Sequence, residues 1–301
     1  MKTFSGAWPA LLTPFDQSDN VSESAINALV DYLLAKGADG FYVCGSTGQG
    51  VYMSVDERKA TLDAVMAQVA GRVPVIVHVG SMVARDAVIL ARHAGEVGAD
   101  GISSIIPPQY PDIESLFHYF SAIGDAAPDL PLLPYILSTS IDIVAFMQKL
   151  FEIPNVAGTK YTGPNMYEFN QIVQIGERLR PGSWTAFSGM DEQCLFAAMF
   201  GSSGNIGSTL NFMMGIYKAI HAAHQAGDLA GARDLQLRAN EVTRTVISFG
   251  FVGAMREAMD MLGIPCGDPR LPGLPFPEER RGEFRQAMAA AGFQEIAAMG
   301  G

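Results

Sequence analysis

Short apolar runs rich in β-branched residues alternate along the chain with longer segments in which apolar residues recur at helical spacing. Val73–Val79 is typical of the runs, and Glu23–Ala35 is typical of the amphipathic segments. The runs indicate strands buried on both faces of a parallel sheet, and the amphipathic segments indicate the helices that cover it. The predicted strands are Trp8–Thr13, Gly40–Cys44, Val73–Val79, Gly101–Ile106, Leu132–Tyr135, Val156–Lys160, Trp184–Ser188 and Ser203–Gly207. The predicted helices between them are Glu23–Ala35, Val55–Ala70, Ala84–Val97, Ile113–Ala126, Ile141–Leu150 and Met166–Leu179.

Eight strand–helix alternations are the number expected for a (β/α)8 TIM barrel of the α/β class, although a doubly wound open sheet has the same local pattern. After Ser208 the strand signal stops, and the remaining chain predicts helices interrupted by a proline-rich turn at Pro265–Pro277. We therefore expect a barrel at residues 1–210 and C-terminal helices at 211–301, packed on the barrel as one structural unit. The predicted C-terminal helices are Phe212–Ala226, Leu229–Ser248, Val252–Leu262 and Glu278–Ala291.

The composition excludes several classes of protein. The 301 residues are 49% hydrophobic and carry a formal net charge of −11, so a phosphate backbone would be repelled and nucleic acid is not an expected partner. No run reaches the roughly 20 apolar residues of a membrane-spanning helix. The three cysteines, Cys44, Cys194 and Cys266, are widely spaced and odd in number, which is typical of reduced thiols. We expect a cytoplasmic protein.

Candidate catalytic residues follow the predicted strands, where the βα loops of a barrel form the catalytic face. Lys160 is the one lysine of six that ends an apolar run, Val156–Thr159; the other five lie in helical segments or at the terminus. Loss of hydration there favours the free amine, which can attack a ketone carbonyl and form an imine. The alternative is a structural lysine in a salt bridge, and the pattern alone leaves both interpretations open.

Two further features lie at strand ends. Tyr135 follows an apolar run and could fill the core, which the pattern favours, or carry protons during imine chemistry. Ser46 and Thr47 lie between Gly45 and Gly48, so backbone N–H groups and hydroxyls are open at a tight turn that suits a small carboxylate. Such a short glycine turn is a weak signal by itself, and it matches no nucleotide-binding fingerprint.

The histidines do not predict a metal site. His221 and His224 form an HxxH pair on a predicted surface helix without a third ligand at useful spacing. His78 ends a predicted strand and could line the barrel, but no acid–serine pair makes it part of a triad. We expect neither a metal nor another cofactor.

At these residues the sequence resembles the N-acetylneuraminate lyase and dihydrodipicolinate synthase family of class I, pyruvate-dependent aldolases. Gly45–Gly48 is similar to the family's loop for the pyruvate carboxylate, Tyr135 falls at its proton-relay tyrosine, and Lys160 falls at its Schiff-base lysine. Tyr110 approximates the tyrosine that a neighbouring subunit contributes. The resemblance implies a (β/α)8 barrel with C-terminal helices, a homotetramer, and catalytic roles for Lys160, Tyr135, Ser46 and Tyr110.

Within that family the chain resembles the sialic acid lyases more closely. Lys160–Thr162 matches the lyase pattern of a threonine two residues after the lysine, and Gly189–Glu192 and Gly207–Asn211 resemble lyase segments that bind a polyhydroxylated tail. Carboxylates accept several hydroxyl donors at once, which suits a sugar acid. The residues expected to bind substrate are Ser46, Thr47, Thr162, Gly189, Asp191, Glu192, Ile206 and Ser208.

The sequence also departs from the family pattern. Gln49 stands where the family usually has a glutamate, and Ile136–Ser138 replaces an asparagine–hydrophobic–proline segment without the arginine typical of the synthases. Our leading hypothesis is a lyase that cleaves N-acetylneuraminate, or a related 2-keto sugar acid, into pyruvate and an aldehyde. The alternatives are dihydrodipicolinate synthase or another pyruvate-dependent aldolase or dehydratase, and a non-catalytic barrel that binds a keto acid.

Overall fold

A computed structural model describes residues 2–107, 112–137 and 141–300. Its eight strands form one parallel sheet in the order β1-β8-β7-β6-β5-β4-β3-β2. Leu11 N donates a hydrogen bond to Tyr42 O, and Ala10 bridges Tyr42, so the first and last strands of this order also meet. The predicted (β/α)8 barrel is therefore confirmed. The strands are β1 Gly6–Pro9, β2 Phe41–Val43, β3 Val75–His78, β4 Gly101–Ile105, β5 Leu132–Leu137, β6 Gly158–Thr162, β7 Thr185–Ser188 and β8 Gly204–Gly207.

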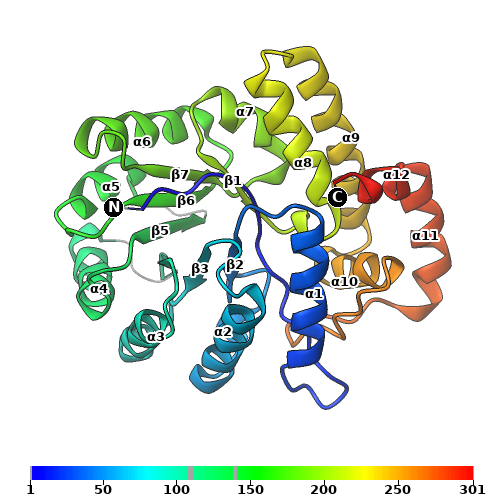
Figure 1. Ribbon diagram of the computed structural model, residues 1–301, viewed down its shortest axis with the longest axis horizontal. Coiled ribbons are helices and arrows are strands. Elements are labelled where there is room, and N and C mark those ends of the chain that lie inside the picture. The colour runs from blue at the N-terminus through cyan, green and yellow to red at the C-terminus, as the bar shows by residue number, and fades with distance from the viewer. Residues whose placement is uncertain (1, 108–111, 138–140, 301) are drawn as a thin grey trace.

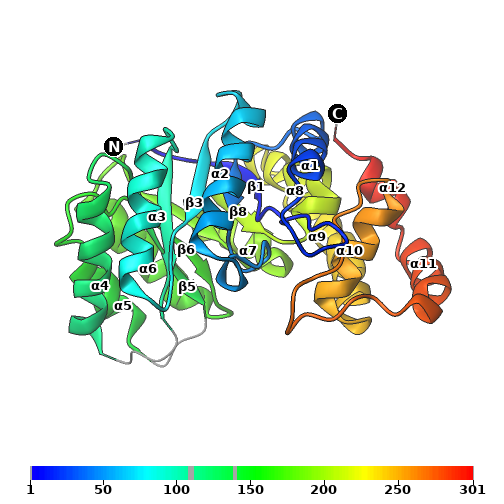
Figure 2. The ribbon, with the colours of Figure 1, turned by 90° about the horizontal axis from the view of Figure 1, so that it is seen from below.

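The helices surround the barrel and continue into a C-terminal group. Figure 1 shows α9 to α12 gathered on one side of the barrel, beside α1 and α8, and Figure 2 shows α3 to α6 at the opposite end of the molecule. The α-helices are α1 Glu23–Ala35, α2 Val55–Val69, α3 Ala84–Glu96, α4 Ile113–Ala126, α5 Ile143–Leu150, α6 Met166–Leu179, α7 Cys194–Met199, α8 Leu210–Gln225, α9 Leu229–Ser248, α10 Phe251–Met261, α11 Arg281–Ala290 and α12 Phe293–Ala298. Short 3₁₀ turns lie at η1 Gly50–Tyr52, η2 Asp191–Gln193 and η3 Glu278–Arg280.

Most predicted helices are confirmed, because polar caps fix where they start. Ser54 accepts a hydrogen bond from Glu57 N while the Glu57 side chain accepts one from Ser54 N, a capping box that begins α2. The sequence missed α7 and α12, since each has six residues and therefore too few positions to display a helical period. The predicted division between 210 and 211 falls inside α8, which packs on β1, and it stays a prediction.

Two predicted strand limits were wrong in a way that concerns the site. The predicted strand Val156–Lys160 is shifted, because β6 begins at Gly158 and continues through Lys160 to Thr162. Likewise β5 extends two residues beyond Tyr135. Lys160 and Tyr135 therefore lie inside β6 and β5 rather than after them. In barrels of this kind the carboxyl ends of the strands tolerate polar side chains that face the lumen.

The strand register sets which side chains enter the barrel. A small interior cluster is separate from the large core between strands and helices, and it contains Phe4, Trp8, Ala10, Tyr42, Ile76, Leu133, Tyr135, Phe187 and Ile206. The large core runs without interruption from the strands into the C-terminal helices. In the described residues, no helix is long and apolar enough to cross a membrane. All three cysteines are buried and free.

Candidate active site

Lys160 lies in the lumen of the barrel, with 4% of its surface exposed. It is in register with Tyr135 on β5, so the two side chains point to the same side of the sheet. Lys160 Nζ lies 4.0 Å from the ring centroid of Tyr135 and 4.4 Å from that of Tyr42. The lysine ion pairs in the described part of the chain involve Lys2, Lys149 and Lys218. The alternative of a salt-bridged structural lysine therefore finds no partner among the described residues.

The Gly45–Gly48 loop follows β2 and is packed too closely for side chains at its glycines. A Cβ at Gly45 would lie 2.6 Å from Tyr42 Cε1, and one at Gly48 would lie 2.7 Å from Leu11 O. Ser46 is exposed, whereas Thr47 Oγ1 makes a 2.6 Å hydrogen bond to Ser208 Oγ. The loop after β2 and the segment after β8 thus meet, as expected if both line one site.

Thr162 and Gly189 lie beside Lys160, and Asp191, which interacts electrostatically with Lys160, packs against Gly207 of β8. A Cβ at Gly189 would lie 1.8 Å from Thr162 Oγ1 and 3.1 Å from Lys160 Cε, so this glycine lets the segment after β7 approach β6. Asp191 Oδ2 accepts hydrogen bonds from Thr209 N (3.0 Å) and Thr209 Oγ1 (2.8 Å). Thr162 Oγ1 and Asp191 Oδ1 are buried without a hydrogen-bond partner in the described structure. Buried polar atoms are usually paired, so these two oxygens keep an unused hydrogen-bonding capacity.

Burial perturbs the carboxyl group of Asp191. Burial raises the pKa of Asp191 to about 6, outweighing the hydrogen bonds from Thr209 that favour the charged form. The 3₁₀ turn that carries Asp191 is held by α9, since Gln236 Nε2 donates to Asp191 O and Asn240 Nδ2 donates to Glu192 O. Glu192 itself is half-buried. No local pattern in the sequence predicts these α9 contacts.

The remaining predicted residues differ in what the structure says of them. Ile206 is fully buried in the interior cluster with Tyr42 and Tyr135, and Tyr110 lies outside the described residues. His78 is buried and its Nε2 accepts from Ile105 N at 3.0 Å. Burial, together with the nearby charges of Arg58 and Lys160, holds the pKa of His78 well below its usual value. His78 is therefore a neutral residue of the barrel lumen.

The HxxH pair does not lie on a freely exposed face, which corrects the sequence-based expectation. His221 is partly buried, and its Nε2 lies 2.9 Å from Asn205 Oδ1 and 3.5 Å from Cys194 Sγ. Within the described residues no group of three His, Cys, Asp or Glu side chains is arranged to hold a metal ion.

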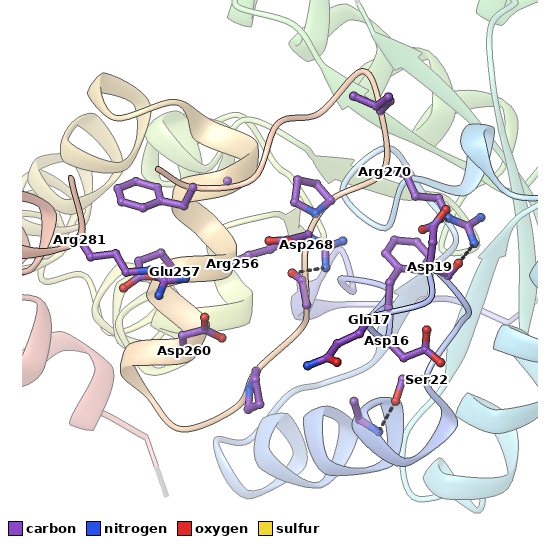
Figure 3. Close-up of a pocket in the computed structure, with 18 residues that line it drawn as sticks. Asp16, Gln17, Asp19, Ser22, Arg256, Glu257, Asp260, Asp268, Arg270 and Arg281 are labelled. Carbon is purple, nitrogen blue, oxygen red and sulfur yellow. Dashed lines mark hydrogen bonds and ion pairs between the residues drawn. The ribbon is translucent and has the colours of Figure 1, made fainter. Parts of the chain in front are cut away.

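Gln49 connects the Gly45–Gly48 loop to α10 and the proline-rich turn. It is 4% exposed and has a left-handed backbone, with φ of 54°. Its Oε1 accepts from Arg270 N (3.0 Å) and Arg256 Nη2 (3.2 Å), and its Nε2 donates to Arg270 O (2.8 Å). A glutamate could not donate to that carbonyl, so the amide is matched to this environment. Arg256 and Arg270 also line a cavity of about 650 Å³ between residues 15–22, α10 and the proline-rich turn (Figure 3).

Replacing Gln49 with methionine will destabilise the protein, because three hydrogen bonds, one buried and two part-buried, are lost and the buried Arg256 loses an acceptor. We expect a cost of roughly 2–4 kcal/mol in the free energy of unfolding. The matched control is Gln17→Met, since Gln17 lines the same cavity but is exposed (Figure 3). Urea unfolding followed by circular dichroism measures the stability of both variants. Equal unfolding midpoints would contradict a stabilising role for the hydrogen bonds of Gln49 with Arg256 and Arg270.

A (β/α)8 barrel with a buried lysine between tyrosine rings at its catalytic end is typical of class I, pyruvate-dependent aldolases, which are carbon–carbon lyases. Comparison with known proteins places the chain more narrowly. The model of the dihydrodipicolinate synthetase family matches residues 3–291, and the chain belongs to this family.

Its relatives include several sialic acid aldolases. The N-acetylneuraminate lyase of Rhizobium meliloti is 34% identical over 287 residues, 94% of each chain. The structure of Proteus mirabilis N-acetylneuraminate lyase superposes with a TM-score of 0.91 at 30% identity, covering 97% of this chain and 100% of that one. A catalytic lysine mutant of Ruminococcus gnavus sialic acid aldolase superposes with a TM-score of 0.89 at 26% identity, covering 97% of each chain.

Proposed function

We propose that the protein cleaves N-acetylneuraminate, or a closely related 2-keto sugar acid, reversibly into pyruvate and an aldehyde. The observation that carries this proposal is the buried Lys160 Nζ over the ring of Tyr135, in a site whose β6–β8 side holds two unpaired buried oxygens, Thr162 Oγ1 and Asp191 Oδ1. An amine in the lumen supplies the nucleophile for a ketone. The unpaired oxygens supply acceptors for the hydroxyl groups of a sugar tail.

In the proposed mechanism, the amine of Lys160 attacks the C2 carbonyl to give a carbinolamine, and its hydroxyl leaves as water with a proton from Tyr135, which forms the iminium and a Tyr135 phenolate. The C3–C4 bond then breaks, its electron pair enters the iminium to give an enamine, and the phenolate accepts the proton of the C4 hydroxyl as C4 becomes an aldehyde. Tyr135 passes this proton to C3, and attack by water on the iminium, with a proton returned to the Tyr135 phenolate, releases pyruvate and regenerates the lysine. The water lost in the first step is consumed in the last, so the net reaction is cleavage alone.

The remaining predicted residues bind the two ends of the substrate. Ser46 and Thr47 hold the C1 carboxylate, because the loop between Gly45 and Gly48 presents hydroxyls and backbone N–H groups. The hydroxylated tail is held by Thr162, Gly189, Asp191, Glu192, Ile206 and Ser208. The 2.6 Å contact of Thr47 with Ser208 supports one continuous binding surface for both ends.

A panel of 2-keto acids, assayed for pyruvate release with coupled lactate dehydrogenase, tests the substrate. We expect turnover of N-acetylneuraminate and weaker turnover of shorter keto-deoxy sugar acids. Condensation of pyruvate with aspartate semialdehyde, without cleavage of any sugar acid, would assign the synthase activity instead. Binding of pyruvate without turnover of any member would assign a keto-acid sensor.

Asp191 predicts the pH dependence of the sugar reaction. Because its pKa is raised to about 6, the free enzyme holds a protonated carboxyl below that pH and a carboxylate above it. We expect kcat/KM for N-acetylneuraminate to fall as the pH drops through about 6, and Asp191→Asn to lose this limb with a roughly 10- to 100-fold lower value above it. Trapping of pyruvate, which has no sugar tail, serves as the control. An unchanged acid limb in the Asn variant would assign it to another group.

The continuous core that joins strands and C-terminal helices supports treating residues 1–210 and 211–301 as one structural unit.

We further propose a cytoplasmic homotetramer in which Tyr110 of a neighbouring subunit completes the proton relay. Light scattering after gel filtration measures the number of subunits in the assembly. A tyrosine acting between subunits predicts that Tyr110→Phe lowers kcat without changing the oligomer.

A further inference from the structure

Tyr42 has no place in the mechanism above, yet its ring is one of the two that contact the reactive nitrogen. The side chain enters the lumen from β2 and has no exposed surface. Lys160 Nζ lies over the ring face, 4.4 Å from the centroid, and over the face of Tyr135 at 4.0 Å. The two ring planes meet at 85°, with centroids 6.2 Å apart. The nitrogen therefore lies in a corner formed by two aromatic faces.

The Tyr42 ring is held in this orientation by its surroundings. Its hydroxyl donates to Ser103 Oγ on β4 at 2.9 Å, which fixes the far end of the ring. Its edge packs against Gly45, where a Cβ would lie 2.6 Å from Tyr42 Cε1. Because the ring is already fixed at both ends, it loses little conformational entropy when a cation forms beside it. The same ring touches the loop expected to hold the substrate carboxylate, so it joins the two halves of the site.

In the described part of the chain, a positive charge on Lys160 Nζ has no carboxylate in contact to stabilise it. No ion pair to Lys160 is present among the described residues, and besides the two tyrosines the titratable groups that interact electrostatically with it are the neutral His78 and Asp191. A positive charge at Nζ is thus buried without a contacting carboxylate, which is costly unless something else stabilises it. Aromatic faces attract cations through the ring quadrupole, and they do so more strongly where water is excluded.

We propose that Tyr42 is a positioning residue whose ring face stabilises the positively charged iminium nitrogen of the Lys160–keto acid intermediate. This inference rests on the proposed function, because that intermediate exists only if Lys160 forms an imine. A carboxylate in the same place could remove the proton from the iminium and weaken it as an electron sink. A ring face stabilises the charge but cannot accept the proton, so the iminium keeps its electron-withdrawing power while the C3–C4 bond breaks.

Stepwise fluorination separates this electrostatic role from packing, because fluorine withdraws electron density from the ring face with little change in shape. The series replaces Tyr42 with phenylalanine, 4-fluoro-, 3,5-difluoro- and 3,4,5-trifluorophenylalanine, with Tyr42→Phe as the reference for the lost hydroxyl. The two readouts are kcat for sugar-acid cleavage and the rate constant for borohydride trapping of pyruvate on Lys160. We expect kcat and the trapping rate constant to fall with each added fluorine, by a total of about 3- to 30-fold from phenylalanine to the trifluoro variant.

The matched control applies the same fluorinated series to Phe187. This residue is also fully buried in the interior cluster and in register with Lys160 on β7, but it packs against Trp8. We expect its series to be flat. A flat series at Tyr42, or equal slopes at both positions, would overturn the proposal while leaving the lyase function intact. Absence of any Lys160 adduct in the unsubstituted protein would overturn both, and circular dichroism confirms that each variant is folded.

Discussion

Replacing Lys160 with arginine will abolish pyruvate release and the borohydride-trapped adduct, with an expected loss in kcat of at least about 10⁴-fold. Arginine keeps a positive charge and much of the bulk, but its guanidinium is not deprotonated in proteins and cannot form an imine. The other lysines of the described chain lie near the N-terminus, at the end of α1, or in α2, α5 and α8, so none is placed to replace Lys160 between the rings of Tyr42 and Tyr135.

Peptide mapping of the reduced pyruvate adduct locates the modified residue. The matched control is Lys149→Arg, since Lys149 lies at the surface and pairs with Glu152 at 2.8 Å. We expect full activity in this control and one modified peptide, containing Lys160, in the unsubstituted protein. An adduct that persists in Lys160→Arg would move the reactive amine elsewhere. Lys160→Ala tests the alternative of a non-catalytic keto-acid sensor. That alternative predicts that the unsubstituted protein and the variant have the same rate of pyruvate release, while keto-acid binding is measured alongside.

The sequence predicted the barrel because its signal is local. Each run such as Val73–Val79 needs only its own residues to indicate a buried strand, and repetition along the chain gives the eightfold count. The limits of β6 were misplaced for the same reason. Lys160 and Thr162 are polar, so a rule that reads apolar runs ends the strand there, whereas the barrel admits polar residues on the lumen side of its catalytic end.

The contacts that complete the site could not be predicted, because they join segments far apart in the chain. Tyr42 belongs to an apolar run in which nothing local shows which residues point inward, and only closure of the barrel brings its ring to Lys160. Gln49 reaches Arg256 across 207 positions, and Gln236 reaches the backbone of Asp191 across 45. The unpaired oxygens at Thr162 and Asp191 are likewise properties of the packing. The residue types at strand ends indicate the class of reaction. The folded geometry adds the unpaired oxygens on which the proposal of a hydroxylated substrate rests.

Tyr135→Phe will separate the two tyrosines that contact Lys160. The phenylalanine ring keeps its face toward Nζ but removes the hydroxyl that carries the proton of the C4 hydroxyl in the proposed mechanism. We expect kcat for sugar-acid cleavage to fall by about 10²- to 10⁴-fold, the usual contribution of general acid–base catalysis. Tyr42→Phe is the matched comparison, because the Tyr42 hydroxyl is already committed to Ser103 Oγ. Its loss should lower kcat only a few-fold, roughly the worth of one hydrogen bond.

Steady-state kinetics on the two variants, with borohydride trapping of pyruvate alongside, distinguish proton transfer from ring packing. Trapping requires imine formation but no cleavage of a C3–C4 bond. If the Tyr135 hydroxyl acts on the C4 proton, cleavage must fall more than trapping in Tyr135→Phe. Equal losses in cleavage for the two variants would mean that both tyrosines serve Lys160 through their rings alone. The proton of the C4 hydroxyl would then need another acceptor in the lumen, and Asp191, whose raised pKa lies within the assay range and whose Oδ1 is unpaired, would be the first residue to substitute.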